Sequence, residues 1–308
     1  MRTIRNWTGV ADMPRGASVA LGNFDGVHRG HQSVIDHARR ASAPLGVVTF
    51  EPHPREVFVP DAPPFRLMNS ESRANRLERL GVDVLYELPF GPALSGLSAE
   101  AFARTVLADG LGVSHVVVGQ DFCFGKGRQG NAAMLRDLGA ALGFDVTIAP
   151  LLTGADGVYS STAIRQALTD GRPGDAATML GHQHRIDGAV LHGEKRGRDL
   201  GFPTANMSIA GLHPPRFGVY AVRVDVLTGP QRGSYCGAAS LGVRPMFGRN
   251  QPNIETYIFD FVGDLYGAHL SVALVAFLRG EEAFDSVEAL VAQMHADCAR
   301  ARAILQGT

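Results

Sequence analysis

Short apolar runs alternate with helical patterns in the first part of the chain, from Ala17 to about Leu180. Almost every residue in these runs is apolar, as expected for strands that are buried on both faces of a sheet. Because helical stretches separate the runs, we expect right-handed βαβ crossovers and a parallel sheet with helices on both sides. The predicted strands are Val19–Leu21, Val47–Phe50, Val84–Leu88, Val116–Val118 and Val146–Ile148.

After Gly181 the pattern changes to closely spaced β-type segments that are broken by glycine and proline. Strands that follow one another without intervening helices favour an antiparallel barrel. The predicted strands are Ile186–Leu191, Gly218–Val226, Tyr235–Leu241, Ile254–Phe261 and Leu270–Leu278. The change of pattern predicts an α/β domain at residues 1–182 and a barrel domain at residues 183–308.

A helix is predicted after Asp285 at the end of the chain. Asp285 and Glu288 have the spacing of a capping box. The apolar residues that follow recur at helical spacing, so we expect this helix to pack an apolar stripe on the barrel. The stripe consists of Val287, Leu290, Val291, Met294 and Cys298.

Composition narrows the possible partners and compartment. The formal net charge of −1 gives no overall attraction for nucleic acid or an anionic membrane, so small molecules are the expected ligands. Cys123, Cys236 and Cys298 lie far apart and form no CxxC pair, which argues against disulfides and structural zinc. Because the chain also lacks an apolar leader or a run long enough to span a membrane, we expect it in the cytoplasm.

The segment Gly22–His31 combines a glycine-rich turn with the start of a predicted helix. Backbone N–H groups and the helix dipole attract phosphate at such a position. His28 and His31 are three residues apart, so their rings can face one anion. The alternatives are a metal site or an incidental pair of histidines. The other candidate binding residues of this segment are Gly22, Asn23, Phe24, Asp25, Gly26 and Gly30.

This segment resembles the G-x-F-D-G-x-H-x-G-H motif of the HxGH nucleotidyltransferases. Blocks at Thr49–Arg55, Val118–Gly125 and Ser160–Arg165 follow in the order found in bacterial bifunctional riboflavin kinase/FAD synthetase, which the whole chain resembles. The resemblance implies that the first domain transfers AMP from ATP to FMN without a protein nucleophile. It further implies that ATP phosphates are bound by Asn23, His28, His31, Ser161, Thr162 and Arg165, and that Asp121 serves the nucleotide or flavin.

The histidine pair and Arg165 are the expected catalytic groups of that reaction, because its transition state is rich in anionic oxygens. An alternative for Ser160–Arg165 is a plain helix cap. Gln120 stands where the family often has an acidic residue.

The second strong resemblance is at Gly193–Asn206, which is similar to the riboflavin kinase block G-x-x-x-G-R-x-L-G-F-P-T-A-N. Loop amides there can bind phosphate, and Thr204 and Asn206, two apart on an extended segment, can direct oxygens toward Mg²⁺. A basic surface hairpin is the alternative. The candidate binding residues of this loop are Gly193, Gly197, Arg198, Gly201 and Pro203.

The segment Asn253–Tyr257 resembles the family's L-E-x-H block, whose glutamate accepts the proton of the ribityl 5′-hydroxyl of riboflavin. Glu255 is therefore the candidate base, although a lone glutamate on a strand is commonly a solvated residue. Tyr257 replaces the histidine of this block, and Met246 replaces a threonine that is common in the family. The resemblance implies that riboflavin, FMN and ATP are the substrates and that FAD is a product.

Other functions must be weighed. The stretch Gly125–Gly130 matches G-x-G-x-x-G, but it follows the fourth predicted strand rather than the first, which argues against an NAD-dependent dehydrogenase. A flavin-binding protein without activity and an enzyme with one working domain, most plausibly the kinase because of Gln120, are the further alternatives. A protein that had lost an activity would be expected to lack some of the motif residues. They are all present, which argues against such a loss.

Overall fold

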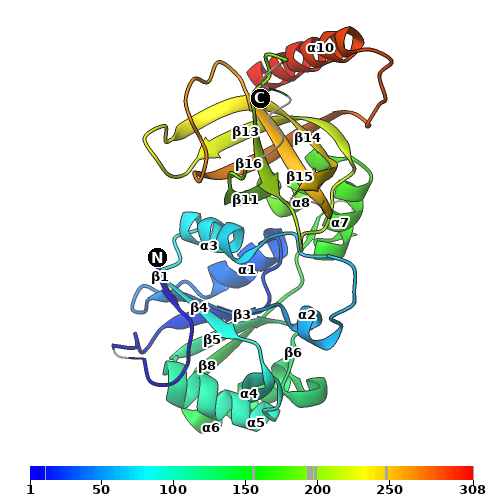
Figure 1. The fold of residues 1–308 in the computed structure, drawn as a ribbon. Coiled ribbons are helices and arrows are strands. Elements are labelled where there is room, and N and C mark those ends of the chain that lie inside the picture. Colours follow the sequence, from blue (N-terminus) through cyan, green and yellow to red (C-terminus); the bar gives the residue numbers. More distant parts are fainter. Residues whose placement is uncertain (11, 155–156, 193–196, 198–199, 247–248, 308) are drawn as a thin grey trace. The chain divides into compact units, whose positions relative to one another are not determined.

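The computed structural model (Figure 1) describes residues 1–10, 12–154, 157–192, 197, 200–246 and 249–307. The chain forms two compact units. The first comprises Met1–Ala62 and Arg73–Tyr159, and the second comprises Pro63–Ser72 and Ser160–Thr308. Both units are therefore discontinuous in sequence.

The first unit contains a six-stranded parallel sheet with the strand order β1-β4-β3-β2-β5-β8. This confirms the predicted α/β fold. β1 was not predicted, because only one of its three residues is apolar. The strands are β1 (Arg2–Ile4), β2 (Ser18–Leu21), β3 (Leu45–Glu51), β4 (Val84–Pro89), β5 (His115–Gly119) and β8 (Asp145–Ala149).

The order of the strands reverses at β2. The chain runs from β2 to β3 and β4 on one side, and returns to β5 and β8 on the other. In open parallel sheets, ligands bind beyond the carboxyl ends of the strands at such a reversal. Since Gly22 follows β2 directly, the first motif lies at this position.

Helices and short strand pairs complete the first unit. The antiparallel pairs are β6 (Cys123–Phe124) with β7 (Gly130–Asn131), and β9 (Thr153–Gly154) with β10 (Gly157–Val158). The helices are α1 (Arg29–His37), α2 (Pro54–Phe58), α3 (Ser70–Arg79, which begins in the second unit), α4 (Pro92–Ser95), α5 (Ala99–Ala101), η1 (Phe102–Leu111), η2 (Lys126–Arg128) and α6 (Ala132–Leu142).

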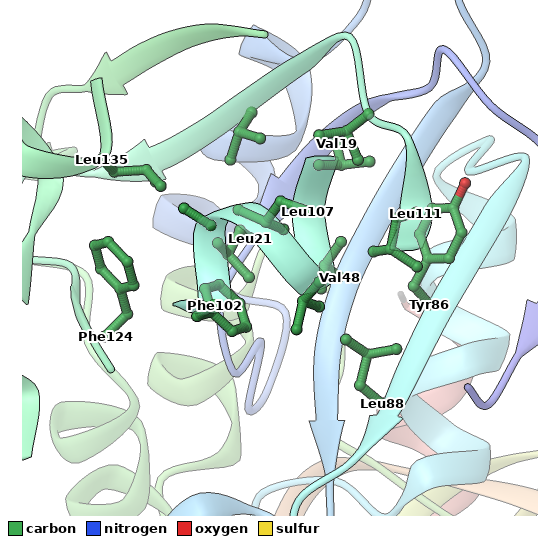
Figure 2. Close-up of a cluster of buried hydrophobic side chains, with 14 of the residues drawn as sticks. Val19, Leu21, Val48, Tyr86, Leu88, Phe102, Leu107, Leu111, Phe124 and Leu135 are labelled. Atoms are coloured by element: carbon green, nitrogen blue, oxygen red, sulfur yellow. The ribbon is translucent and has the colours of Figure 1, made fainter. Parts of the chain in front are cut away.

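The core of the first unit fixes the sheet beneath the motif. η1 is a π-helical stretch, and it contributes Phe102, Leu107 and Leu111 to a buried cluster. Figure 2 shows these side chains beside residues of the sheet, among them Leu21 of β2 and Tyr86 of β4. Because these side chains are nearly or fully buried, the end of β2 is held by packing on one face.

The second unit contains a six-stranded antiparallel sheet with the order β11-β16-β13-β14-β15-β12. The amide of Leu191, just after β11, donates to the carbonyl of Asn206 in β12 at 2.8 Å, which brings the two edges together. The predicted barrel is thus confirmed. The strands are β11 (Arg185–Ala189), β12 (Thr204–Ser208), β13 (Gly218–Val226), β14 (Gly233–Met246), β15 (Arg249–Ile258) and β16 (His269–Arg279).

Two helices that precede the barrel strands belong to the second unit, α7 (Ser161–Thr169) and α8 (Pro173–Leu180). They share a small core with Leu67, which comes from the early segment Pro63–Ser72. The boundary at residues 182 and 183 stays a prediction about where the two activities divide.

The terminal helix α10 (Val287–Gln306) is present, but the prediction of its cap is wrong. The N-cap is Ser286, whose Oγ accepts from the amide of Ala289 at 3.1 Å, and not Asp285. The predicted stripe is also only partly buried, since Val287 is 56% exposed. The helix instead packs mainly through its second half, where Ala301 and Leu305 join a cluster on the outer face of the barrel.

The cap assignment predicts unequal effects of two neighbouring substitutions. Ser286→Ala should lower the free energy of unfolding of the second unit by about 1 kcal/mol, because the amide of Ala289 loses its acceptor. Asp285→Ala should change it by no more than a few tenths. Urea unfolding followed by circular dichroism measures both values, and equal effects would contradict the assignment.

Candidate functional site

The turn between β2 and α1 is strained. Phe24 and Val27 have positive φ angles of 51° and 42°, and both side chains are buried. A positive φ is unfavourable for any residue with a Cβ, and most of all for a β-branched one such as Val27. Strain of this kind persists only where the surrounding structure imposes it, and it is typical of functional sites.

The two motif histidines stack at the start of α1. Their ring centroids are 3.6 Å apart with an interplanar angle of 20°. His28 is the N-cap, and its Nδ1 accepts from the backbone amide of His31 at 3.3 Å. Since this nitrogen is an acceptor, a neutral His28 carries its proton on Nε2. A Cβ at Gly30 would lie 3.1 Å from the His28 ring, so the glycine leaves room for the stack.

His31 is held in its neutral form. Burial, and then the neighbouring His28, lower the pKa of His31 well below its ordinary value. The edge of the ring of His31 meets Phe24 at a centroid distance of 5.2 Å. Its Nδ1 is buried without a hydrogen-bond partner in the described part of the chain. A buried polar atom of this kind costs free energy unless a ligand or water satisfies it.

The other predicted residues of the first unit lie at the same edge of the sheet. The Oγ1 of Thr49 in β3 donates to the carbonyl of Asn23 at 3.1 Å, which ties the motif turn to the neighbouring strand. Asn23 is exposed, whereas Asp25 is buried. Asp121 is exposed just beyond the end of β5, where Gln120 also lies. The sheet therefore brings the residues that follow β2, β3 and β5 to one edge.

An exposed apolar patch near this edge was missed from the sequence. It consists of Val57, Phe58 and Val59, which are 38%, 65% and 51% exposed. Phe58 makes an edge contact with Phe90 at 5.6 Å, and Phe90 makes another with buried Phe50 at 5.7 Å. The signal in the sequence is the apolar run that begins two residues after Arg55.

A buried ion pair at the ends of β3 and β4 was also missed. Arg73 is 2% exposed, and its Nη2 donates to Glu51 at 2.7 Å and to Glu87 at 2.9 Å. Glu87 also accepts from Arg5 at 3.0 Å. These contacts join residues far apart in sequence, so spacing alone could not reveal them.

The block Ser160–Arg165 forms the start of α7 in the second unit. Ser160 is a helix cap, as the plain alternative had it, because its Oγ accepts from Ala163 at 3.2 Å. Arg165 is half-buried, and its Nη1 donates to the carbonyl of Phe65 at 3.2 Å. The carbonyl of Arg165 in turn accepts from Nε2 of His213 at 3.0 Å. Ser161 and Thr162 lie in the first turn of the helix.

The loop before β12 carries the second set of predicted residues. Gly193 and Arg198 lie outside the described residues. At Gly197 a Cβ would come 2.4 Å from the carbonyl oxygen of Phe202, so no other residue fits there without movement. Gly201 has a φ of 82°, which favours glycine, and Pro203 is exposed just before β12.

β12 and β15 place the remaining predicted residues on one face. In the antiparallel register Asn206 is opposite Glu255, and Thr204 is opposite Tyr257. Directly opposed side chains project from the same face. The alternate residues of these strands, such as Met207 and Ile254, lie in the barrel core instead.

Aromatic contacts account for one of the departures from the family pattern. The ring of Tyr257 lies 5.1 Å from that of Phe202, which also contacts His295 of α10 at 5.0 Å. Tyr257 therefore packs against Phe202, in the segment that resembles the riboflavin kinase block. Met246 is the last residue of β14.

A pocket of about 80 Å³ opens beside Thr204 in the second unit. Its lining combines apolar and aromatic side chains with polar groups. Its lining includes Thr204, Thr256, Phe261, Asp264 and Tyr266.

The oxygen donors of β12 fit a hard cation. No group of three or more His, Cys, Asp or Glu residues suited to a metal occurs in the described part of the chain. Thr204 and Asn206 supply a neutral hydroxyl and a carboxamide oxygen from one face. Such a pair suits Mg²⁺, which takes few protein ligands and completes its shell with phosphate oxygens and water.

The G-x-G-x-x-G stretch has the wrong context for a dinucleotide site. Gly125–Gly130 lies between the short strands β6 and β7 and includes η2, rather than the turn from a parallel strand into a long helix. The structure thus gives the dehydrogenase alternative no support.

Family models match both halves of the chain. The model described as FAD synthetase matches residues 10–163, and the model described as riboflavin kinase matches residues 180–305.

Three curated relatives are similar over most of their length, and each is named bifunctional riboflavin kinase/FMN adenylyltransferase. The protein of Pseudomonas fluorescens is 41% identical over 310 residues, which cover 99% of this chain and 98% of the relative. That of Escherichia coli K12 is 36% identical and covers 98% and 97%. That of Bacillus subtilis is 38% identical and covers 91% and 89%.

A solved structure also matches nearly the whole chain. It is titled macrolide-efflux protein from Streptococcus pneumoniae, with a TM-score of 0.80, 34% identity and 96% coverage of both chains. Among the described residues of the present chain, no helix is both long enough and apolar enough to span a membrane.

The low pKa of His31 predicts a loss of stability in acid. An unfolded histidine titrates near 6.5. Folded His31 resists protonation, so below that pH the unfolded state binds more protons and the first unit loses stability as the pH falls. His31→Gln should remove up to roughly 2 kcal/mol of the loss between pH 7 and pH 5. Urea unfolding followed by the fluorescence of Trp7, the one tryptophan of the chain, measures this, and parallel curves would contradict it.

Proposed function

The chain belongs to the family of bifunctional riboflavin kinase/FMN adenylyltransferases, and we propose that its own residues carry out both reactions of that family. ATP phosphorylates riboflavin to FMN, and a second ATP donates AMP to FMN, which gives FAD and pyrophosphate. The observation that carries the proposal is the intact polar group set in each family match. The stacked histidines lie in the first match, and the opposed pair Asn206 and Glu255 lies in the second.

In the adenylyl transfer, a phosphate oxygen of FMN bonds to the α-phosphorus of ATP while the bond to pyrophosphate breaks. Negative charge on the transferring group is stabilised by donors that are already in place. The Nε2–H of His28 and the amides at the start of α1 are such donors, and stacking holds His31 beside them. We assign Ser161, Thr162 and Arg165 to ATP phosphates and Asp121 to the nucleotide or flavin.

We assign the exposed patch Val57–Val59 to the flavin ring. An isoalloxazine is flat and largely apolar, and an exposed aromatic side chain offers it a face or an edge to pack on. Phe58 is backed by the edge contact with Phe90, so its position is fixed before the flavin arrives. Exposure of three consecutive large apolar residues is costly unless they bind something.

In the kinase reaction, the ribityl 5′-oxygen bonds to the γ-phosphorus of ATP, and ADP leaves. Glu255 accepts the proton of that hydroxyl as the bond forms. The pocket beside Thr204 receives the nucleotide, since its aromatic and apolar lining suits a purine.

Thr204 and Asn206 would hold Mg²⁺ together with oxygens of the ATP phosphates. The ion would neutralise charge on the transferred phosphoryl group. The task of the protein is to present the two oxygens from one face of β12, which the strand does through its alternation.

We propose that the enzyme works in the cytoplasm on small molecules alone. Cys123, Cys236 and Cys298 are free thiols, as in a reducing compartment. We place the division of activities at residues 182 and 183, close to the start of the riboflavin kinase match at residue 180.

Loss of the second histidine should disable the adenylyl transfer. We expect His31→Ala to lower FMN adenylylation by about 10²-fold, the scale for losing one preorganised group. Riboflavin phosphorylation by the same variant should be unchanged. His37→Ala is the matched control, because His37 is exposed at the end of the same helix. Chromatographic separation of FMN and FAD reports both reactions, and an undiminished FAD yield would refute the assignment.

Glu255→Gln should disable the kinase, since it keeps the shape of the side chain and removes its basicity. We expect kcat for riboflavin to fall by about 10²-fold with little change in KM. Supplied with FMN, the variant should make FAD at the parent rate. Glu288→Gln, an exposed change on α10, is the control. Near-full kinase activity in Glu255→Gln would leave Glu255 without a catalytic role.

A further inference from the structure

Asn253 in β15 is almost completely buried, with 1% of its surface exposed. Neither Oδ1 nor Nδ2 of its carboxamide has a hydrogen-bond partner among the residues that the structure describes. Each unsatisfied polar atom at such a position destabilises the fold, and an apolar side chain of equal size would not. A buried carboxamide with both polar atoms unpaired destabilises the free protein. Such a residue is typically one whose hydrogen bonds are made by a bound ligand.

The position of Asn253 places it in the kinase site. It precedes Glu255 by two residues in a strand without a bulge, so both side chains project from the same face. Across the sheet it is opposite Ser208 of β12 and Gly242 of β14. Asn206 is its diagonal neighbour on β12.

Another asparagine of the same unit shows the usual state of such a side chain. The Oδ1 of Asn69 accepts from the amide of Ser72 at 2.8 Å, and its Nδ2 donates to the carbonyl of Asp187 at 2.8 Å. Asn69 is thus paired at both ends by the fold. It provides a matched comparison for Asn253.

The chemistry of a carboxamide limits what can complete it. A cation would use Oδ1 and repel Nδ2, whereas a phosphate would use Nδ2 and leave Oδ1 unpaired. Adjacent hydroxyls satisfy both atoms, because each hydroxyl donates and accepts. The substrate of this site carries a chain of hydroxyls next to the reacting one.

We propose that Asn253 binds the ribityl chain of riboflavin through the hydroxyls beside the 5′ position, and so aligns the 5′-hydroxyl with Glu255. This inference rests on the proposed kinase function. It makes Asn253 a substrate-binding residue that also selects flavins with an intact ribityl chain. A buried water in place of the substrate is the competing explanation.

The first test compares stability. Asn253→Leu should leave the melting temperature unchanged or raise it, because it replaces two unpaired atoms by apolar ones. Asn69→Leu should lower it by several degrees, since it breaks two hydrogen bonds. A drop for Asn253→Leu equal to that of Asn69→Leu would show that the fold or a water satisfies the carboxamide, and would overturn the proposal.

The second test uses a substrate that lacks one hydroxyl, 4′-deoxyriboflavin. The parent enzyme should phosphorylate riboflavin with a kcat/KM at least about 10-fold above that of the deoxy analogue. Asn253→Leu should bring this ratio close to 1, while Asn69→Leu should keep it. The ratio does not depend on the fraction of folded enzyme, so partial misfolding cannot mimic the result. A parental ratio in Asn253→Leu would overturn the proposal.

Glu255→Gln separates this inference from the proposed function. If that variant retains kinase activity, the site itself is wrongly assigned and the role of Asn253 fails with it. If Glu255→Gln is inactive while Asn253→Leu discriminates like the parent, the site stands and only the role of Asn253 is wrong. FMN adenylylation should be unchanged in all three variants.

Discussion

The proposed kinase site depends on the register in which β12 pairs with β15. This register sets Asn206 opposite Glu255 on the outward face and leaves Met207 and Ile254 in the core. A slip by one residue would reverse both faces, burying a carboxylate and exposing the apolar residues. The hydrophobic alternation that closes the barrel therefore also brings the proposed base and metal ligands together, with no separate device to align them.

In the first unit, core packing rather than strand register positions the histidine pair. Its sheet is held by a dense core under η1, and on that support the turn after β2 keeps Phe24 and Val27 at positive φ. The strained turn directs the chain into α1 with His28 as its cap. The histidine stack thus results from packing several residues away, which explains why the unfavourable backbone is maintained.

Periodicity predicted most of the long strands of both units, though not β1 or β12, and local motifs supplied the candidate residues of both sites, because those signals lie in neighbouring residues. Pairings between distant segments left no such signal. Arg73 with Glu51 and Glu87, and Leu67 within the second unit, belong to this class. The prediction of the α10 cap was wrong for another reason. Asp and Ser are both common N-cap residues, so only the geometry of the helix start shows that Ser286 and not Asp285 is the cap. The unpaired state of Asn253 is likewise a property of its surroundings.

The segment Pro63–Ser72 belongs to the second unit, although it is synthesised well before Ser160–Thr308. Synthesis proceeds from the N-terminus, so the first unit is complete once Tyr159 has left the ribosome. Leu67 can be buried only after Ile164 and its neighbours have been synthesised. During that interval a nascent chain displays an apolar segment in the middle of an otherwise finished unit, and this segment is where a chaperone or a second nascent chain would bind.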